Sequence, residues 1–379
     1  MKQTARIISI HAADTSGVCS MLYELGGMVV VHDASGCNST YSTHDEPRWY
    51  DHESMVYISG ISEMEAIMGD DEKLISDIVR DATELKPRFI AIAGTPIPAM
   101  TGFDFAAAAQ VIEARTGIPS FGFATTGMGT YIEGAGMALE AVVRRFTKRG
   151  IEKTARPSVN ILGLTPLDFS INGEDKSVAA WLKKNGFSIG ASLAMDCTLE
   201  DIECIGAAHV NLVVSACGLP AARALYELFG TPYVIGLPVA GEYAALLSQR
   251  LKSAAQKGES FPHQGFIFDC PRKGAAVIGE GVRSLSLAEA LTLQGVPAYA
   301  VCASEFKADH LRPCDVVAPD EDEIIEVIAP ADTVIADPLY KPIVPAEKRF
   351  ITRPHEAFSG RIFRKDIPDI VKDGFDIDR

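Results

Sequence analysis

Residues 29–54, VVVHDASGCNSTYSTHDEPRWYDHES, concentrate side chains that can bind metals or carry protons. A run of three valines, typical of a buried strand, leads directly into His32, and Cys37 follows in the same stretch. A cysteine thiolate is the soft ligand that iron–sulfur clusters require, and Gly36 would let the backbone approach such a group closely. We therefore expect Cys37 to be a metal ligand and Gly36 to border a cofactor.

Histidine and acidic side chains occur throughout this stretch and could transfer protons to a substrate. The candidates are His32, His44, Asp45, Glu46 and His52. An alternative is that the histidines satisfy loop carbonyls and carboxylates. In that alternative, Glu46 and its acidic neighbours form an ion-pair network with Arg48 that fixes a long loop. Both interpretations stay open at the level of sequence.

Two further cysteines stand where a cofactor could be contacted. Cys19, in DTSGVCSMLYELGG, would lie on a helix beside the strand that leads to Cys37, and it is a second candidate metal ligand. Cys217 comes just past the strand-like segment HVNLVVS and is a candidate for cofactor contact. A buried cysteine at a strand–helix turn is the common structural alternative.

A G-x-G pattern at Gly127 and Gly129 lies between a strand-like and a helical segment. Glycines at such a position can line a cofactor, and we count both as candidate cofactor-binding residues. The full G-x-G-x-x-G pattern of dinucleotide-binding loops is missing, which favours a tight turn.

The elements that must position these residues alternate between strands and helices, the pattern of a parallel α/β architecture. Runs rich in β-branched residues predict buried strands at 29–32, 88–94, 158–164, 209–215, 275–280 and 332–337. Periodic apolar residues predict helices at 70–86, 287–295 and 320–329. Parallel sheets bind ligands beyond the carboxyl ends of their strands, and residues 33–54 leave the end of strand 29–32. This placement favours a binding site there.

Two charged or turn-rich joints, 148–158 and 256–266, divide the 379 residues into three blocks. We expect an N-terminal α/β domain at 1–155 with the cluster-binding loop. A second Rossmann-like domain is expected at 156–265, and a third at 266–379 with a C-terminal tail.

Composition excludes several classes of function. The net charge of −15, from 35 Lys and Arg against 50 Asp and Glu, argues against nucleic acid or an anionic membrane as a partner. No apolar run approaches the length of a membrane span, and residues 1–17 are too weakly apolar for a signal peptide, so we expect a soluble cytoplasmic protein. The eight cysteines contain no CxxC pair and are expected to form no disulfide framework. No G-x-x-x-x-G-K-[ST] motif is present, so this chain is not expected to bind ATP.

The order of four segments resembles the component 1 family of nitrogenase and nitrogenase-like oxidoreductases. The segments are VVVHDASGC (29–37), ISEMEAIMGDDEKL (61–74), KPRFIAIAGTPIPAMTGFDF (86–105) and IPSFGFATTGMGTYIEGAGMALEAVV (118–143), with weaker similarity to about residue 300. The resemblance implies three Rossmann-like parallel-sheet domains and subunits paired around an iron–sulfur cluster. It also implies a partner, an ATP-hydrolysing iron protein that supplies electrons.

The sequence departs from the family pattern at several cluster positions. Cys37 matches a cluster-ligating cysteine, but Pro96 stands where the family has its third. The cysteine that binds the catalytic cofactor falls near Ser215, with Cys217 two residues on. The resemblance therefore implies one [4Fe–4S] cluster shared between two subunits, with Cys37 and Cys19 from each as ligands.

On this basis we expect an oxidoreductase that acts on a tetrapyrrole or another small molecule rather than on dinitrogen. It would pair as a homodimer, or as a heterodimer with a related component 1 subunit. Two alternatives remain, a scaffold that carries a metallocluster or tetrapyrrole without turnover, and a non-catalytic sister subunit.

Overall fold

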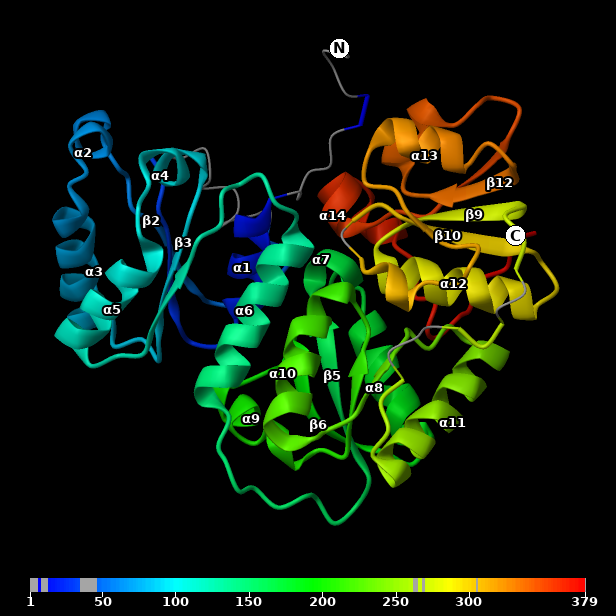
Figure 1. Cartoon of the computed structure of the whole chain (residues 1–379), viewed down its shortest axis with the longest axis horizontal. Helices are drawn as coiled ribbons and strands as arrows, with labels where there is room; N and C mark the ends of the chain where they lie inside the picture. Colours follow the sequence, from blue (N-terminus) through cyan, green and yellow to red (C-terminus); the bar gives the residue numbers. More distant parts are fainter. Residues whose placement is uncertain are drawn as a thin grey trace.

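The computed structural model describes residues 6–7, 13–34, 46–261, 265–267, 270–304 and 306–378. These residues form three parallel sheets with helices on their faces, which confirms the predicted α/β class (Figure 1). In that view the first sheet lies at the left, the second at the bottom and the third at the upper right. Each sheet falls within one of the three predicted blocks, while the domain boundaries themselves stay a prediction.

The first sheet has the order β2–β1–β3–β4. Its strands are β1 (Met28–Val31), β2 (Met55–Ile58), β3 (Ile90–Ala93) and β4 (Ser120–Phe123). Its helices are α1 (Asp14–Leu22), α2 (Glu63–Met68), α3 (Asp71–Leu85), α4 (Pro96–Thr101), α5 (Phe105–Thr116) and α6 (Tyr131–Phe146). The predicted helix at 70–86 is confirmed as α3, because its apolar residues recur on one face and bury Leu74, Ile78 and Ala82 against the strands.

The second sheet has the order β6–β5–β7–β8. Its strands are β5 (Ser158–Leu164), β6 (Ser188–Ala194), β7 (Val210–Val213) and β8 (Tyr233–Ile235). Its helices are α7 (Pro166–Phe169), α8 (Glu174–Lys184), α9 (Leu199–Glu203), α10 (Leu219–Phe229) and α11 (Glu242–Lys257), with the 3-10 turns η2 (Ile205–Ala207) and η3 (Ala216–Gly218). All seven residues of β5 are buried, as its run of β-branched and apolar residues predicts.

The third sheet has the order β11–β10–β9–β12–β13. Its strands are β9 (Gly274–Gly279), β10 (Ala298–Cys302), β11 (Val316–Val317), β12 (Ala331–Ala336) and β13 (Arg349–Thr352). Its helices are α12 (Gly281–Leu293), α13 (Glu321–Val327) and α14 (Glu356–Ser359), with the 3-10 turns η4 (Ala308–His310), η5 (Pro338–Ile343) and η6 (Gly360–Asp366). The strands predicted at 275–280 and 332–337 are thereby confirmed.

The residues after η6 return from the third sheet to the second. The Ser177 hydroxyl in α8 lies 2.5 Å from the Asp369 carboxylate, and the N–H of Ile370 donates to Glu174 Oε1 (3.2 Å). Ile370 and Val371 are buried in the apolar core that the second and third sheets share. The tail is therefore part of the packing of the second sheet.

Candidate functional site

The order of strands in the first sheet changes direction at β1. β1 is followed by β2 on one side, whereas β3 lies on its other side. Such a switch point is where open parallel sheets bind ligands. Oγ1 of Thr95, just after β3, lies 2.9 Å from the carbonyl oxygen of His32 and 3.1 Å from Oδ1 of Asp33. The chain that leaves β1 is thus held at the predicted edge of the sheet.

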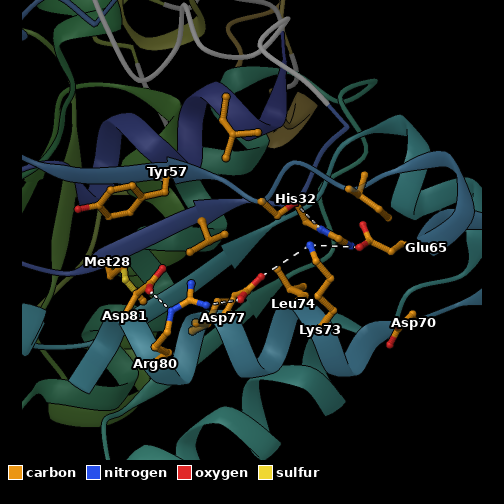
Figure 2. A pocket seen from close by; sticks show the side chains of 15 residues that line it. Met28, His32, Tyr57, Glu65, Asp70, Lys73, Leu74, Asp77, Arg80 and Asp81 are labelled. Atoms are coloured by element: carbon orange, nitrogen blue, oxygen red, sulfur yellow. Dashed lines mark hydrogen bonds and ion pairs between the residues drawn. The ribbon is translucent and has the colours of Figure 1, made fainter. Parts of the chain in front are cut away.

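His32 begins this site, and its ring is buried. Nδ1 lies 2.8 Å from the hydroxyl oxygen of Ser59, and the ring packs on Phe103 with 4.6 Å between centroids. It borders a cavity of about 200 Å³ beside α3, where the Lys73 ammonium and the Glu65 carboxylate pair at 3.1 Å (Figure 2). Burial lowers the pKa of His32 to about 4, so the ring is neutral at pH 7. These surroundings favour a structural role, and the predicted proton transfer by His32 stays a prediction.

Glu46 belongs to a buried ion-pair network, as the alternative interpretation of the sequence had it. Its Oε1 accepts from Nε of Arg48 (2.6 Å), and Nη1 of Arg48 pairs with Glu24 (2.8 Å). The guanidinium also lies over the ring of Tyr23, 4.9 Å from its centroid. This network fixes residues 46–50 against α1. His52 is exposed.

The remaining predicted residues of the loop lie outside the described residues. They are Gly36, Cys37, His44 and Asp45. The roles assigned to them stay predictions.

Cys19 occupies a buried position in α1. It packs in the apolar core of the first sheet and exposes 3% of its surface. Burial, followed by the negative charge of Glu46, raises the pKa of the Cys19 thiol to about 12. The thiol is therefore neutral without a metal, whereas a bound metal deprotonates its thiol ligands. The predicted ligand role of Cys19 stays a prediction.

Gly127 and Gly129 form a tight turn that Asp14 closes. The two carboxylate oxygens of Asp14 accept the N–H groups of Thr126 and Gly127, each at 2.8 Å, and the N–H of Asp14 donates to the carbonyl oxygen of Gly129 (2.9 Å). Gly127 has φ 73°, and a Cβ there would lie 2.9 Å from Cδ of Pro96. The N–H of Gly127 is thus already bonded within the chain, which supports the tight-turn interpretation. Cofactor binding by either glycine stays a prediction.

Cys217 is fully buried in η3, at the carboxyl end of β7. Its Sγ lies 3.3 Å from Oγ of Ser215. Burial and the charge of Asp168 raise the pKa of this thiol well above its usual range. Cys217 therefore stays a neutral thiol, and its predicted contact with a cofactor stays a prediction.

The model of a known protein family matches residues 16–328 of the chain, and its description is "Nitrogenase component 1 type Oxidoreductase". The match spans most of the chain, including the first two sheets and the strands β9, β10 and β11 of the third. The chain belongs to the nitrogenase component 1 type oxidoreductases. The resemblance drawn from the four sequence segments is thereby confirmed.

Curated component 1 relatives match this chain over part of their length. One subunit of the light-independent protochlorophyllide reductase of Nostoc punctiforme is 26% identical over 303 residues, which cover 69% of this chain and 59% of that protein. The nitrogenase iron-molybdenum cofactor biosynthesis protein NifE of Klebsiella pneumoniae is 27% identical over 193 residues, covering 48% and 41%. This chain therefore spans about half the length of these relatives.

A solved structure supports the component 1 fold. The structure described as "Nitrogenase Cp1 at pH 6.5" superposes with a TM-score of 0.62 at 16% identity, covering 98% of this chain and 88% of that one. At that identity, the similarity establishes the arrangement of the three sheets and no shared activity.

The predicted iron–sulfur cluster would take two ligands, Cys37 and Cys19, from this chain. Cys19 lies in the apolar core of the first sheet and Cys37 lies outside the described residues, so the cluster stays a prediction. In the described part of the chain, no group of three or more histidine, cysteine, aspartate or glutamate side chains is placed to hold a metal ion. Within the same residues, no helix is long and apolar enough to cross a membrane.

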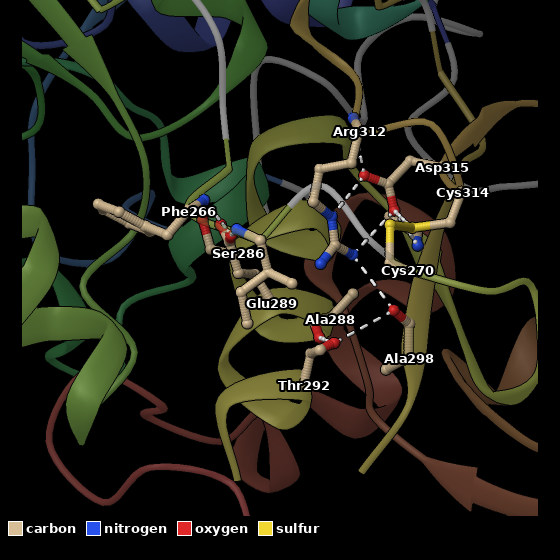
Figure 3. A network of polar contacts seen from close by, with 12 residues as sticks. Phe266, Cys270, Ser286, Ala288, Glu289, Thr292, Ala298, Arg312, Cys314 and Asp315 are labelled. Atoms are coloured by element: carbon tan, nitrogen blue, oxygen red, sulfur yellow. Dashed lines mark hydrogen bonds and ion pairs between the residues drawn. A yellow bond between two sulfur atoms is a disulfide. The ribbon is translucent and has the colours of Figure 1, made fainter. Parts of the chain in front are cut away.

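A disulfide was missed by the sequence interpretation, which expected none. Cys270 pairs with Cys314, 44 residues along the chain (Figure 3). The turn that carries Cys314 is fixed by Arg312 and Asp315, whose buried side chains pair at 2.9 Å. No sequence pattern signals a contact between residues that far apart. The pairing of β9 with β10 brings them together in the fold.

Sequence reasoning also missed a cavity of about 310 Å³ between the first and third sheets. Its lining includes Tyr131 at the start of α6, together with Ser304, Tyr340 and Phe358. Tyr131 lies directly after the G-x-G turn, and that proximity was the one available signal in the sequence.

Proposed function

We propose that this chain is one subunit of a nitrogenase-like reductase that receives electrons from an ATP-hydrolysing iron protein. An iron–sulfur cluster at the seam between two subunits would relay the electrons to a tetrapyrrole or another small substrate. Membership of the component 1 family is the observation that carries this proposal. The cytoplasmic location expected from the sequence stays part of it.

The ligands of that cluster would come from two chains. A [4Fe–4S] cluster takes four ligands, so Cys37 and Cys19 of two copies would supply all of them. Cys37 lies outside the described residues, and Cys19 is a buried thiol. In place of Cys19, a carboxylate such as Asp33 or Asp45, or cysteines of a related partner chain, would supply the other two.

An exposed apolar surface supports pairing with a second component 1 subunit. We call it the methionine face, and it comprises Met64, Ile67, Met68, Ile97, Met100 and Met128. Met100 and Met128 expose 87% and 84% of their surface, and α2 packs against α4. An apolar surface is complementary to itself, whereas the net charge of −15 makes other surfaces of two copies repel each other. The methionine face also lies beside the edge where Asp33 leaves β1.

The pairing is tested by measuring the mass of the native particle in solution. We expect a dimer, and Met100→Glu with Met128→Glu should convert it to a monomer, because two buried carboxylates would face each other. Ile362→Glu is the matched control, since Ile362 is 74% exposed but lies in η6, outside the methionine face. A dimer that survives the double substitution would place the interface elsewhere.

The cluster is tested by anaerobic iron and sulfide analysis of the complex purified with its iron protein. Cys37→Ala should remove both iron and sulfide. Cys204→Ala should remove neither, because Cys204 is an exposed free cysteine to which no role is assigned. Iron retained in full by Cys37→Ala would overturn the proposal.

Two alternatives make different predictions in the same preparation. A scaffold or carrier would transfer a metallocluster or tetrapyrrole stoichiometrically to an acceptor, with no substrate conversion when the iron protein and ATP are added. A non-catalytic sister subunit, purified without partners, would contain neither iron nor a dimer.

A further inference from the structure

A small cavity that opens to solvent lies between the start of α6 and the third sheet. Its volume of about 310 Å³ lies at the lower end of the range of ligand pockets, about 300–1,000 Å³, and fits a small molecule. Within the described residues, the buried hydroxyl of Ser304 on its wall has no hydrogen-bond partner. Two carboxylates, Asp320 and Glu321, also line it, and they favour a neutral or cationic ligand over an anion.

Tyr131 connects this cavity to a buried carboxylate. Tyr131 is one of the residues that line the cavity, and its hydroxyl donates to Oδ1 of Asp168 at 2.5 Å. Asp168 is fully buried in α7, and its second oxygen, Oδ2, has no partner among the described residues. A buried carboxylate with one unsatisfied oxygen lowers the stability of the fold unless it gains a proton. Such a group in a native protein therefore points to a function.

His355 approaches the same oxygen of Asp168 from the third sheet. Its Nε2 lies 3.3 Å from Oδ1, while its Nδ1 accepts the N–H of Ala357 (3.3 Å) at the start of α14. Nε2 makes no hydrogen bond among the described residues, so His355 lies beside Asp168 without donating to it. The ring also packs on Phe358, another cavity residue, with 4.7 Å between centroids.

We propose that Tyr131 and Asp168, with His355 beside them, form a proton-transfer unit for a small molecule bound in this cavity. When the Tyr131 hydroxyl turns to donate to the ligand, Asp168 loses a donor, takes up one proton and donates it to the Tyr131 oxygen. Once the ligand has been reduced, the Tyr131 proton passes to it and the Asp168 proton passes to Tyr131. Asp168 is left as a carboxylate that accepts from Tyr131, as the structure shows it.

This inference rests on the proposed reductase only for the source of the electrons. Ligand-linked uptake of a proton by Asp168 requires neither a cluster nor the iron protein. Tyr131 would touch the ligand, whereas Asp168 would hold the proton.

The charged groups around Asp168 come from four further elements. Glu280, which precedes α12, is buried, and burial together with the charge of Asp168 raises its pKa to about 7. Arg283 of α12 pairs with Glu174 of α8 at 2.8 Å, and Arg353, after β13, has a pKa lowered to about 9 by burial and by Arg283. Cys217 of η3 is the remaining titratable neighbour. These groups are common to every variant proposed below and do not change between them.

Pyridine is a suitable probe because it is small, neutral at pH 7 and accepts one hydrogen bond. Its ring vibrations, measured by infrared spectroscopy, should show a hydrogen bond from Tyr131 in the wild-type protein. Tyr131→Phe should abolish that signature and weaken binding roughly two- to tenfold. Tyr340→Phe is the matched control, because it removes a hydroxyl from the same cavity without a contact to Asp168. A signature that persists in Tyr131→Phe would overturn the proposal, and so would a failure of pyridine to bind.

Proton uptake is measured from the pH dependence of pyridine affinity near pH 7. We expect affinity to fall as the pH rises, by up to about tenfold per pH unit, because one proton binds with the ligand. Asp168→Asn should make the affinity independent of pH, and Tyr131→Phe serves if that variant does not fold. An affinity that is independent of pH in the wild-type protein, or an unchanged slope in Asp168→Asn, would refute the proton-transfer unit even if the reductase proposal holds.

Discussion

Arg283 in α12 and Glu174 in α8 form an ion pair of 2.8 Å in which each side chain exposes only 2% of its surface. The pair joins the third sheet to the second. Removing one partner of a buried pair leaves the other charge unpaired in an apolar setting. Glu174→Gln should therefore lower the free energy of unfolding by about 3–5 kcal/mol, measured by denaturant titration.

The control for that prediction is an exposed pair of the same chemical type. Nη1 of Arg349 lies 3.6 Å from Oδ1 of Asp378, and the two side chains are 50% and 89% exposed. Solvent screens such a pair, so Asp378→Asn should change stability very little. Equal effects of Glu174→Gln and Asp378→Asn would show that the Arg283–Glu174 pair is not buried in solution.

Stability should fall in acid because of His32. Its folded pKa of about 4 lies below the ordinary histidine value near 6.5, so the unfolded chain binds more protons between these values. The contribution of His32 is therefore complete above about pH 6.5 and is lost as the pH falls towards 4. His32→Phe keeps a ring on Phe103 but cannot bind a proton, so its unfolding free energy should depend less on pH across this window. The check is chemical unfolding of both proteins at several pH values, and parallel curves would contradict the prediction.

The turn after β4 should not tolerate a side chain at Gly127. Its φ of 73° is strained for alanine by about 1–2 kcal/mol, and a Cβ would also press on Pro96 at 2.9 Å. Gly150 has the same φ, but a Cβ there meets nothing within 4 Å. Gly150→Ala therefore measures the cost of the backbone conformation alone. Gly127→Ala should lower the melting temperature more than Gly150→Ala, as measured by calorimetry. Equal shifts would mean that Pro96 moves aside.

The disulfide should contribute to stability under oxidising conditions. Cys270 and Cys314 enclose 44 residues of chain, and the loop-entropy model gives about 4 kcal/mol for a loop of that length. Cys270→Ser with Cys314→Ser should lower the melting temperature, and a reducing agent should lower that of the wild-type protein by the same amount. Cys204→Ser, at an exposed free cysteine, should change neither value. A melting temperature that does not respond to reduction would show that the two thiols are not joined.

Much of the fold could be predicted from the sequence because local patterns determine it. The valines of β1 and the periodic apolar residues of α3 mark their elements without help from distant residues. The G-x-G turn was recognisable for the same reason. Its partner was not, because Asp14 reaches Gly127 across 113 residues of sequence.

The candidate site was predicted less completely. Glu46 and Arg48 are two residues apart, so their ion pair could be foreseen as an alternative to catalysis. The contact between Tyr131 and Asp168 depends on how α6 packs beside α7, and no spacing in the sequence encodes that distance. The burial of Cys19 likewise follows from the packing of α1 against α6, which periodicity does not reveal.

The return of the C-terminal tail to the second sheet has a consequence for how this protein matures on the ribosome. Ile370 and Val371 complete a core whose other members begin at Val159, about two hundred residues earlier in synthesis. Part of the apolar core of the second sheet therefore stays exposed until translation has almost finished. During that interval it would be the natural place for a chaperone to bind.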